Sequence, residues 1–151
     1  METNLGKLRN LMKILIMNWL FIEGPLIQLE FMKTMGKIEF DELAAFKKDL
    51  KILLKKYRTL KDDLEVVKLD LNDDPGESPP FSFQINNLGI KTCIIKVKKI
   101  ACKALKGRGV NSGLRLIYAH FSMEQKITFI ELYHKNDKET EDRARIMDNF
   151  S

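Results

Sequence analysis

Apolar residues recur at two different spacings along this chain, and the change of spacing separates helices from strands. Between residues 41 and 71 they lie three or four positions apart, which is typical of helices with one buried face. The pattern predicts one helix from Asp41, its expected N-cap, to about Tyr57. A second helix is expected from a capping-box-like Thr59 to just before Asn72. The short connection between the two helices predicts an antiparallel hairpin.

The second half of the chain is rich in isoleucine, valine and phenylalanine, which favour strands. An earlier strand is expected at 37–40, ahead of the helical hairpin. The strands expected after the hairpin are 81–85, 90–105, 114–121 and 126–134. A charged C-terminal segment follows, with a helix around 140–147. A strand, two helices and an antiparallel meander predict an α+β domain with the helices on one face of the sheet.

Residues 1–31 differ from the rest, because a basic start precedes the apolar run Ile14–Ile22. This resembles the beginning of a signal peptide, but the run is too short to cross a bilayer comfortably and no clear cleavage site follows. Five of the seven methionines lie in the first 35 residues. We therefore expect residues 1–35 to be an extension, either a mis-assigned start or an extra packing helix, in front of a domain at 36–151. A targeting segment is the remaining alternative.

The positive charge of the chain is concentrated in one window. The net charge is +5, yet no Asp or Glu lies between Glu77 and Glu124. This window holds eight cations, namely Lys91, Lys96, Lys98, Lys99, Lys103, Lys106, Arg108 and Arg115. The rest of the chain is therefore negative overall. A local positive field on a mildly acidic protein predicts a surface that faces phosphate groups, above all those of nucleic acid.

Four of these cations are expected to converge. Lys103, Lys106, Arg108 and Arg115 come from one expected strand, the glycine-rich loop after it and the next strand. Convergent cations bind a phosphodiester and stabilise the charge that develops when a 2′-hydroxyl attacks phosphorus. Arg115 is the strongest candidate, because an arginine between two leucines of an expected central strand needs a partner. For single lysines such as Lys98, a solvated strand face is the simpler explanation.

A second candidate group closes the last expected strand. His134, beside Lys135, is suited to general acid or base chemistry near neutral pH, although a structural histidine fits the sequence equally well. Glu131 either accepts a proton from a 2′-hydroxyl or, as we favour, forms an ion pair with Arg115 or a lysine.

Several common catalytic motifs are missing from the sequence. It has no Walker-type loop, dinucleotide fingerprint, HExxH motif, carboxylate cluster or nucleophile elbow. Its two cysteines fit neither a disulfide scaffold nor a zinc site, which favours a reducing, cytoplasmic setting. We expect no metal and no other cofactor if the protein is an enzyme.

Four segments, in this order, resemble the RelE/ParE superfamily of type II toxin–antitoxin toxins, and in particular its RelE- and HigB-like branch. KKYRTLKDDLEVV resembles the helical hairpin and ACKALKG the basic strand. SGLRLIYAHF resembles the strand that carries the family's arginine, here Arg115, and IELYHKNDKE resembles the closing strand. The resemblance spans about Gly36 to Met147. It implies a small RelE-like, microbial-ribonuclease-like α+β fold, with the helical hairpin packed on an antiparallel sheet.

The resemblance also implies a function. Toxins of this type are metal-independent endoribonucleases that cleave mRNA, usually at the ribosome, and a cognate antitoxin neutralises them. By resemblance, Arg115 stabilises the phosphate in the transition state, Lys103 and Lys106 orient the backbone, and His134 contributes acid–base chemistry. The expected RNA contacts are Arg108, Lys98, Lys99 and Lys135.

One departure from the family concerns the C-terminus, where Arg143 and Arg145 follow the last strand without a tyrosine. The general base is therefore unassigned. Two alternatives remain open, a ParE-like inhibitor of DNA gyrase and a non-catalytic member that binds RNA or the ribosome. The expected partners are an antitoxin, mRNA and the ribosome, and no membrane.

Overall fold

A computed structural model describes residues 4–20 and 36–151 and divides the chain into two compact units, Met1–Lys37 and Ile38–Ser151. The first unit contains helix α1 (Asn4–Leu20), which falls within the expected extension. The end of the apolar run and the candidate starts at Met32 and Met35 lie outside the described residues. None of the described helices combines the length and the apolar character needed to cross a membrane. All the elements that follow belong to the second unit.

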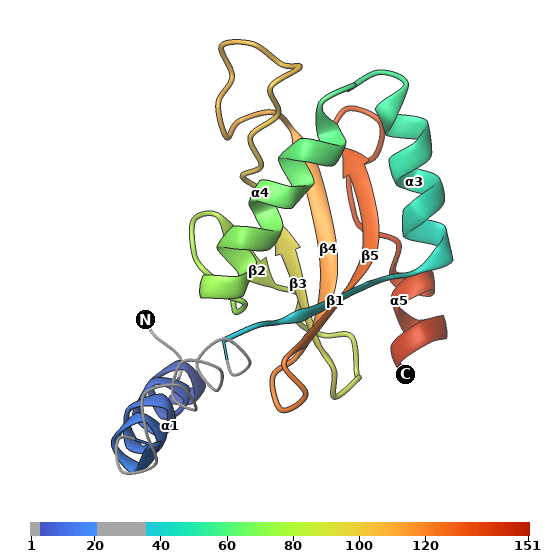
Figure 1. Cartoon of the computed structure of the whole chain (residues 1–151). Coiled ribbons are helices and arrows are strands. Elements are labelled where there is room, and N and C mark those ends of the chain that lie inside the picture. The colour runs from blue at the N-terminus through green and yellow to red at the C-terminus, as the bar shows by residue number, and fades with distance from the viewer. Residues whose placement is uncertain (1–3, 21–35) are drawn as a thin grey trace. The chain divides into compact units, whose positions relative to one another are not determined.

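Among the described residues, the second unit is an α+β domain built on one five-stranded mixed sheet, with strand order β1-β5-β4-β3-β2 (Figure 1). Its elements are β1 (Glu39–Glu42), α3 (Ala44–Leu54), α4 (Leu60–Asp73), β2 (Ser82–Gln84), β3 (Cys93–Val97), β4 (Leu114–Phe121), β5 (Lys126–His134) and α5 (Arg143–Phe150). Strands β2 to β5 form the expected antiparallel meander. Strand β1 pairs in parallel with β5 and extends the sheet by one strand.

Strands β4 and β5 match their predicted bounds because their apolar runs are buried on both faces of the sheet. Along β4, Leu116 and Tyr118 pack on the side of α3 and α4, whereas Ile117 and Ala119 pack on the opposite side. Strand β4 is the central strand of the sheet. It therefore holds its side chains in fixed directions on both faces.

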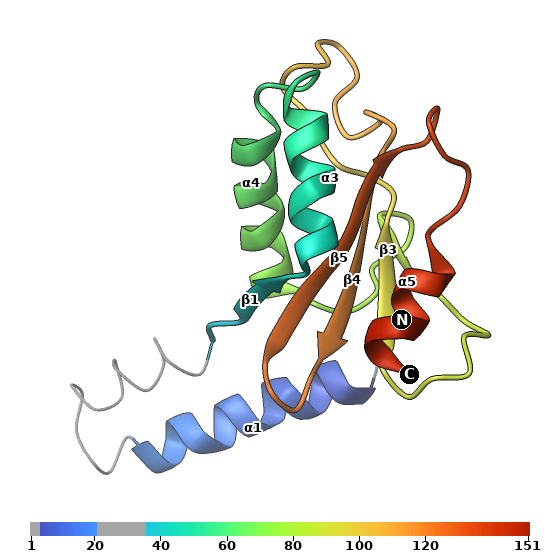
Figure 2. The same cartoon turned by 90° about the vertical axis from the view of Figure 1, so that its right-hand side faces the viewer.

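The sheet lies between two layers of helix. Figure 2 shows the hairpin of α3 and α4 against one face and α5 against the other. In the hairpin, Phe46 packs 5.3 Å from the ring of Phe129 on β5. On the other face, Ile146 of α5 is fully buried with Ile117 and Ile130. The prediction of helices on one face is therefore correct for the hairpin and wrong for α5.

The predicted N-cap at Asp41 is also wrong. Asp41 belongs to β1, where it lies opposite Thr128 of β5, and the helix begins only after Leu43. A parallel pairing to a strand so far along the chain leaves no local signal in the sequence. The predicted strand at 37–40 is thus shifted, and it continues to Glu42 at the expense of the helix.

The predicted strand 90–105 is too long, because the chain leaves the sheet after Val97 and forms a loop at 98–113. The carboxylate of Asp63 accepts hydrogen bonds from the backbone N–H of Lys103 at 3.3 Å to each oxygen. The hydroxyl of Thr59 accepts a hydrogen bond from the N–H of Ala104 at 2.9 Å. These bonds hold the first half of the loop against the start of α4. The segment ACKALKG is therefore a loop and not a strand.

The Asp63 carboxylate is buried and fixes this loop, which leads to the first prediction. Asp63→Ala should lower the free energy of unfolding by about 1–3 kcal/mol, because it leaves the Lys103 N–H and the Thr59 hydroxyl without their acceptor. Hydrogen exchange at Lys103 should become faster. Asp62→Ala is the matched control, because Asp62 is exposed in the same first turn of α4 and shares the interaction with the helix dipole. Equal effects of the two substitutions would contradict this role of Asp63.

Candidate nucleic-acid interface

Arg115 lies on the central strand, on the face of the sheet that α5 partly covers. It is paired with Tyr133 of β5 and lies next to Ile117 on the same face. Its Nη1 donates hydrogen bonds to the backbone carbonyls of Lys98, at 2.8 Å, and Leu114, at 3.1 Å. The side chain is half-buried. The partner that the sequence required for Arg115 is therefore a pair of neutral carbonyl groups.

This anchoring leaves the other edge of the guanidinium group available. Nε and Nη2 of Arg115 make no hydrogen bond or ion pair within the described part of the chain. The two groups point in the same direction and match the spacing of two phosphate oxygens. Because carbonyl groups carry no net charge, the positive charge of Arg115 is not compensated by its anchor. The geometry is that of a preorganised anion contact.

Lys98 is a neighbour of Arg115 on this face. It directly follows β3, whose last residue Val97 lies opposite Leu116, so Lys98 lies across from Arg115. Its ammonium group is 4.8 Å from the centre of the Phe83 ring on the edge strand β2. Such a cation–π contact orients the lysine without neutralising its charge. Lys98 and Arg115 together offer two uncompensated charges at one end of the sheet.

The start of β4 and the end of β5 pack closely against each other. Gly113 has φ +89°, and a Cβ atom at this position would lie 2.6 Å from Nε2 of His134, so only glycine fits. The carbonyl of Gly113 accepts a hydrogen bond from the N–H of Lys135 at 2.9 Å. This closure precedes Arg115 by two residues and fixes the direction of the strand that carries it.

His134 is part of this closure. It is buried; its Nδ1 accepts a hydrogen bond from the N–H of Asn136 at 3.1 Å, and its Nε2 lies 2.9 Å from the carbonyl of Ser112. Because Nδ1 accepts this bond, Nε2 is the ring nitrogen placed to donate to the Ser112 carbonyl. Its ring stacks on Tyr57, with the ring centres 6.0 Å apart. Acid–base chemistry by His134 stays a prediction, and it would require these backbone bonds to break.

Toward the middle of the sheet, the cations on this face are neutralised. Lys96 of β3 donates to Glu141 at 2.9 Å, and both side chains are largely buried. Glu131 of β5 pairs with Lys138 and accepts a hydrogen bond from the N–H of Asp142 at 2.8 Å. The prediction that Glu131 forms an ion pair with a lysine is therefore confirmed. Residues 138–142 are held across the sheet by these two pairs.

The pairing changes the protonation of Lys96 and Glu141. Burial alone would lower the pKa of Lys96, but the neighbouring Tyr133 hydroxyl and Glu141 carboxylate outweigh burial, and the pKa is raised. Burial alone would raise the pKa of Glu141, but the Lys96 ammonium group outweighs it, and this pKa is lowered. Both shifts favour the charged pair. Lys96 is therefore not available to a phosphate unless Glu141 is displaced.

Tyr133 is a polar residue of this face that the sequence analysis did not assign. Its hydroxyl is buried and has no hydrogen-bond partner of ordinary geometry among the described residues. The ammonium groups of Lys96 and Lys138 lie 5.8 and 5.4 Å from the centre of its ring. The sequence could have identified it, because Tyr133 lies directly opposite Arg115 when the two predicted strands are paired as a hairpin.

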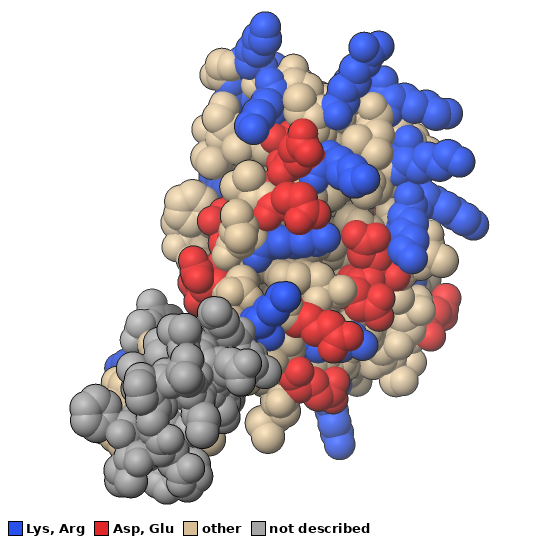
Figure 3. Space-filling view, viewed as in Figure 1, with Lys and Arg blue, Asp and Glu red and all other residues tan. Residues whose placement is uncertain are grey.

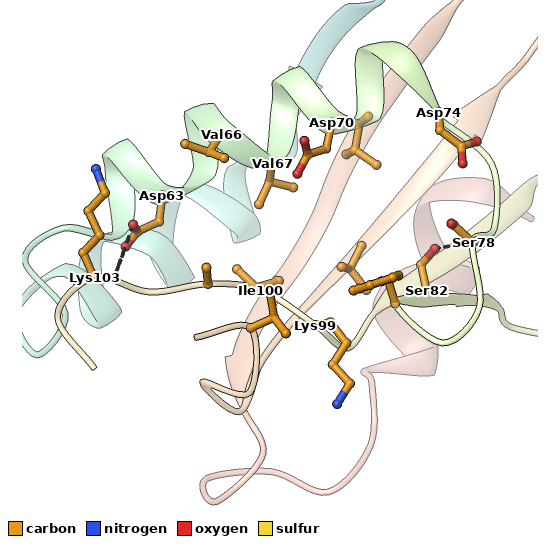
Figure 4. A pocket seen from close by; sticks show the side chains of 15 residues that line it. Asp63, Val66, Val67, Asp70, Asp74, Ser78, Ser82, Lys99, Ile100 and Lys103 are labelled. Atoms are coloured by element: carbon orange, nitrogen blue, oxygen red, sulfur yellow. Dashed lines mark hydrogen bonds between the residues drawn. The ribbon is translucent and has the colours of Figure 1, made fainter. Parts of the chain in front are cut away.

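Lys103 lies elsewhere, on the side of the sheet that the helical hairpin covers. It lines a groove of about 410 Å³ between α4 and residues 97–103, shown in Figure 4. The floor of the groove is apolar, with Val67 and Ile100 facing one another across it, and Asp70 lies at its rim. The predicted convergence of Lys103 with Arg115 is therefore wrong, because the loop carries Lys103 to the opposite face.

The remaining predicted contacts lie around the same end of the sheet. Lys106, Arg108 and Lys135 are exposed, the first two on the loop 98–113 and the third directly after β5. Lys99 is half-buried and donates to the side chain of Asn111 at 2.5 Å. These cations thus lie on segments at the end of the sheet where β4 begins and β5 ends.

No protein-family model, curated protein or solved structure matches this chain. Within residues 4–20 and 36–151, no group of three His, Cys, Asp or Glu side chains is arranged to hold a metal ion. The interpretation of the site therefore depends on its own geometry.

The second prediction concerns the pair of Lys96 and Glu141. Glu141→Gln should lower the free energy of unfolding at neutral pH by about 2–3 kcal/mol, because it leaves the buried Lys96 ammonium group unpaired. The pKa of Glu141 is lower in the folded than in the unfolded chain, where it is about 4.5. The contribution of the pair is therefore complete above that value and disappears as the pH falls through the folded-state pKa.

Denaturant titrations across the acid range should show this difference. The stability of the unsubstituted protein should fall more steeply with acidification than that of Glu141→Gln, and the two curves should converge in acid. Glu139→Gln is the control, because Glu139 is exposed on the same segment. A constant difference between the Glu141→Gln protein and the unsubstituted protein at every pH would show that the pair does not cause it.

Proposed function

We propose that this protein is the toxin of a type II toxin–antitoxin system and a metal-independent endoribonuclease that cleaves mRNA at the ribosome. The observation that carries the proposal is the anchored guanidinium group of Arg115. It is held through Nη1 on the central strand, and its Nε–Nη2 edge makes no hydrogen bond or ion pair with any residue that the structure describes. A fixed, uncompensated cation on a rigid strand is suited to stabilising a phosphoryl transition state.

The arrangement of elements supports a RelE-like fold. The helical hairpin of α3 and α4 lies between β1 and the meander in the chain and covers one face of the sheet. The candidate pair Lys98 and Arg115 lies on the opposite face. The site is therefore separated from the main hydrophobic core, so its charges do not oppose folding of that core.

In the proposed reaction, the 2′-hydroxyl of the RNA loses its proton to water and attacks the adjacent phosphorus. The bond from phosphorus to the 5′ oxygen breaks, and this oxygen takes up a proton from water. The products are a 2′,3′-cyclic phosphate and a 5′-hydroxyl end. The phosphoryl oxygens gain negative charge on the way, and the free edge of Arg115 donates two hydrogen bonds to them. Lys98 supplies a second positive charge beside the same phosphate. Both act without moving, because their backbone and ring contacts already hold them.

The other predicted residues take different roles in this proposal. Lys106, Arg108 and Lys135 attract the RNA backbone around the site, since they are exposed at the same end of the sheet. Lys103 does not contact the reacting phosphate, because it lies on the helical side of the sheet. His134 is left out of the reacting group, because backbone contacts occupy both ring nitrogens.

An antitoxin is part of the proposal, because a free toxin of this kind stops growth of the cell that makes it. An acidic segment of that partner would neutralise the uncompensated cations near Arg115.

The third prediction tests the proposal directly. Arg115→Ala should abolish growth inhibition and reduce the rate of mRNA cleavage by about 100- to 1,000-fold, because it removes the preorganised donors to the transition state. Arg115→Lys should restore little activity, because one ammonium group cannot both hold the Lys98 carbonyl and donate two parallel bonds to phosphate. Arg143→Ala is the matched control, an exposed arginine on α5.

The measurement is inducible expression in a bacterial host, with growth and the 5′ ends of mRNA recorded together. New cuts inside translated messages that disappear in Arg115→Ala would support the proposal. Growth arrest with intact messages and damaged DNA would favour inhibition of DNA gyrase instead. Growth arrest with intact messages and intact DNA would favour non-catalytic binding to RNA or the ribosome. Full toxicity of Arg115→Ala would show that the site is wrongly assigned.

A further inference from the structure

A second basic surface lies on α3 and on its turn to α4, away from Arg115. Its members are Lys47, Lys48, Lys51, Lys55, Lys56 and Arg58, all of them exposed. The single acidic residue within 47–58 is Asp49. Asp49 is turned toward the sheet, where it accepts hydrogen bonds from Nη1 of Arg145 at 2.7 Å and from the N–H of Leu132 at 3.2 Å. The one carboxylate that could compensate these cations locally is thus already used.

The six cations form no ion pair with a carboxylate anywhere in the part of the chain that the structure describes. Lys47, Lys51 and Lys55 are spaced by four residues, so they form one row along the helix with a rise of about 6 Å between neighbours. Like charges at this spacing repel and destabilise a helix by a few tenths of a kcal/mol per pair. Lys47 and Lys48 also lie near the helix N-terminus, where positive charge is unfavourable. The helix dipole favours Lys51 in the last turn and Lys55 at the C-cap, so folding accounts for part of this row but not for Lys47.

This surface is continuous with the loop 98–113. Thr59 accepts a hydrogen bond from the N–H of Ala104, so Arg58 lies beside the first half of that loop. Figure 3 shows basic side chains along the side of the domain where Figure 1 places α3, and further ones at the end that carries the loop. Acidic side chains occupy much of the middle and lower part of that view. Basic side chains therefore dominate these two regions, whereas both signs occur in the middle of the view.

The surface lacks the features that a single strand or a membrane would need. Phe46 and Tyr57, the aromatic residues of the segment, are buried, so no exposed ring is available to stack on an unpaired base. The apolar face of α3 is packed on the sheet, and Ile52 is the single large apolar residue of α3 that is mostly exposed. A membrane-binding helix would expose an apolar face beside its lysines. A rigid row of charges without stacking groups fits a regular sugar–phosphate backbone.

We propose that the α3 surface binds the backbone of base-paired RNA, as a docking contact separate from the site at Arg115. The proposal rests on the proposed function for the choice of RNA as the nucleic acid. Duplex RNA is recognised mainly through its shape and its phosphates, and an exposed helical row of lysines meets a run of phosphates along one strand. Docking by α3 holds the domain on structured RNA while the opposite face of the sheet acts on an unpaired segment.

The fourth prediction measures this contact with a blunt RNA duplex of about 16 base pairs and no unpaired nucleotides. All variants carry Arg115→Ala, so that no cleavage occurs during the titration. Reversal of the row (K47E, K51E and K55E together) should weaken duplex binding at least tenfold at low salt. The slope of log affinity against log salt, measured between about 50 and 200 mM, should fall by about three, or one per lost phosphate contact.

Two controls separate the surface from general charge effects. Lys91→Glu reverses an exposed lysine outside the surface and should change duplex binding much less than Lys51→Glu, which carries the same charge change. The triple arginine variant K47R/K51R/K55R keeps the charge and should keep the affinity. Circular dichroism and thermal unfolding establish that each variant is folded.

The result that overturns the proposal is an unchanged duplex affinity after triple reversal, or an effect of Lys91→Glu as large as that of Lys51→Glu. Absence of duplex binding by the parent protein at low salt also overturns it. With Arg115 restored, cleavage of an unpaired RNA should be unaffected by reversal of the row. Duplex binding without any cleavage would reject the proposed nuclease and leave the α3 surface in place, so the two failures are distinguishable.

Discussion

The pairing of β4 with β5 is the constraint on which the rest of the second unit depends. These two strands are buried on both faces, and the hairpin, β1, β3 and α5 all pack against them. A charged side chain in such strands must find a partner, because an unpaired charge there is strongly destabilising. Arg115 is held by carbonyl groups, Glu131 by Lys138 and a backbone N–H, and His134 by the backbone on both sides. Local order at the candidate site thus follows from the need to satisfy buried polar groups.

The same need determines which charges remain uncompensated. The carboxylates nearest the sheet are engaged in ion pairs across elements, as with Asp49 and Arg145 or Glu141 and Lys96. Among the described residues, many of the cations that form no ion pair with a carboxylate lie on the outside of α3, on the loop 98–113 and beside the end of β4. The uncompensated positive charge therefore lies where no carboxylate is available, because the carboxylates near the sheet already form ion pairs.

How much of this could be predicted from the sequence depends on whether the signal was local. Strands β4 and β5 were predicted to the residue, because a long run of apolar, β-branched and aromatic residues suits only a doubly buried strand. The end of β3 was missed, because Asp63 and Thr59, about forty positions earlier in the sequence, form the hydrogen bonds that hold the loop after it. Asp41 was misassigned for the same reason, since its strand exists only through the distant β5.

The candidate site shows the same division. The central position of Arg115 followed from the strand pattern, and a lysine was one of the two partners predicted for Glu131. The anchoring carbonyl of Lys98 and the position of Lys103 on the other face did not follow from the sequence. The net charge of the whole chain did not reveal the α3 surface, because the acidic residues of α4 cancel the lysines of α3 in that sum. A count restricted to residues 47–58 shows six cations and one acid, and it would have revealed the surface.

The anchoring of Arg115 by carbonyl groups has a consequence for how a phosphate would compete for it. Had a carboxylate held the guanidinium group, a phosphate would need to break an ion pair before it could bind, as it would at Lys96. A carbonyl anchor fixes the geometry through Nη1 and leaves both the net charge and the second edge intact. The ordering of the side chain is then complete before any ligand arrives, so ligand binding does not bear that entropic cost. Arg115 therefore combines a fixed direction with an uncompensated charge.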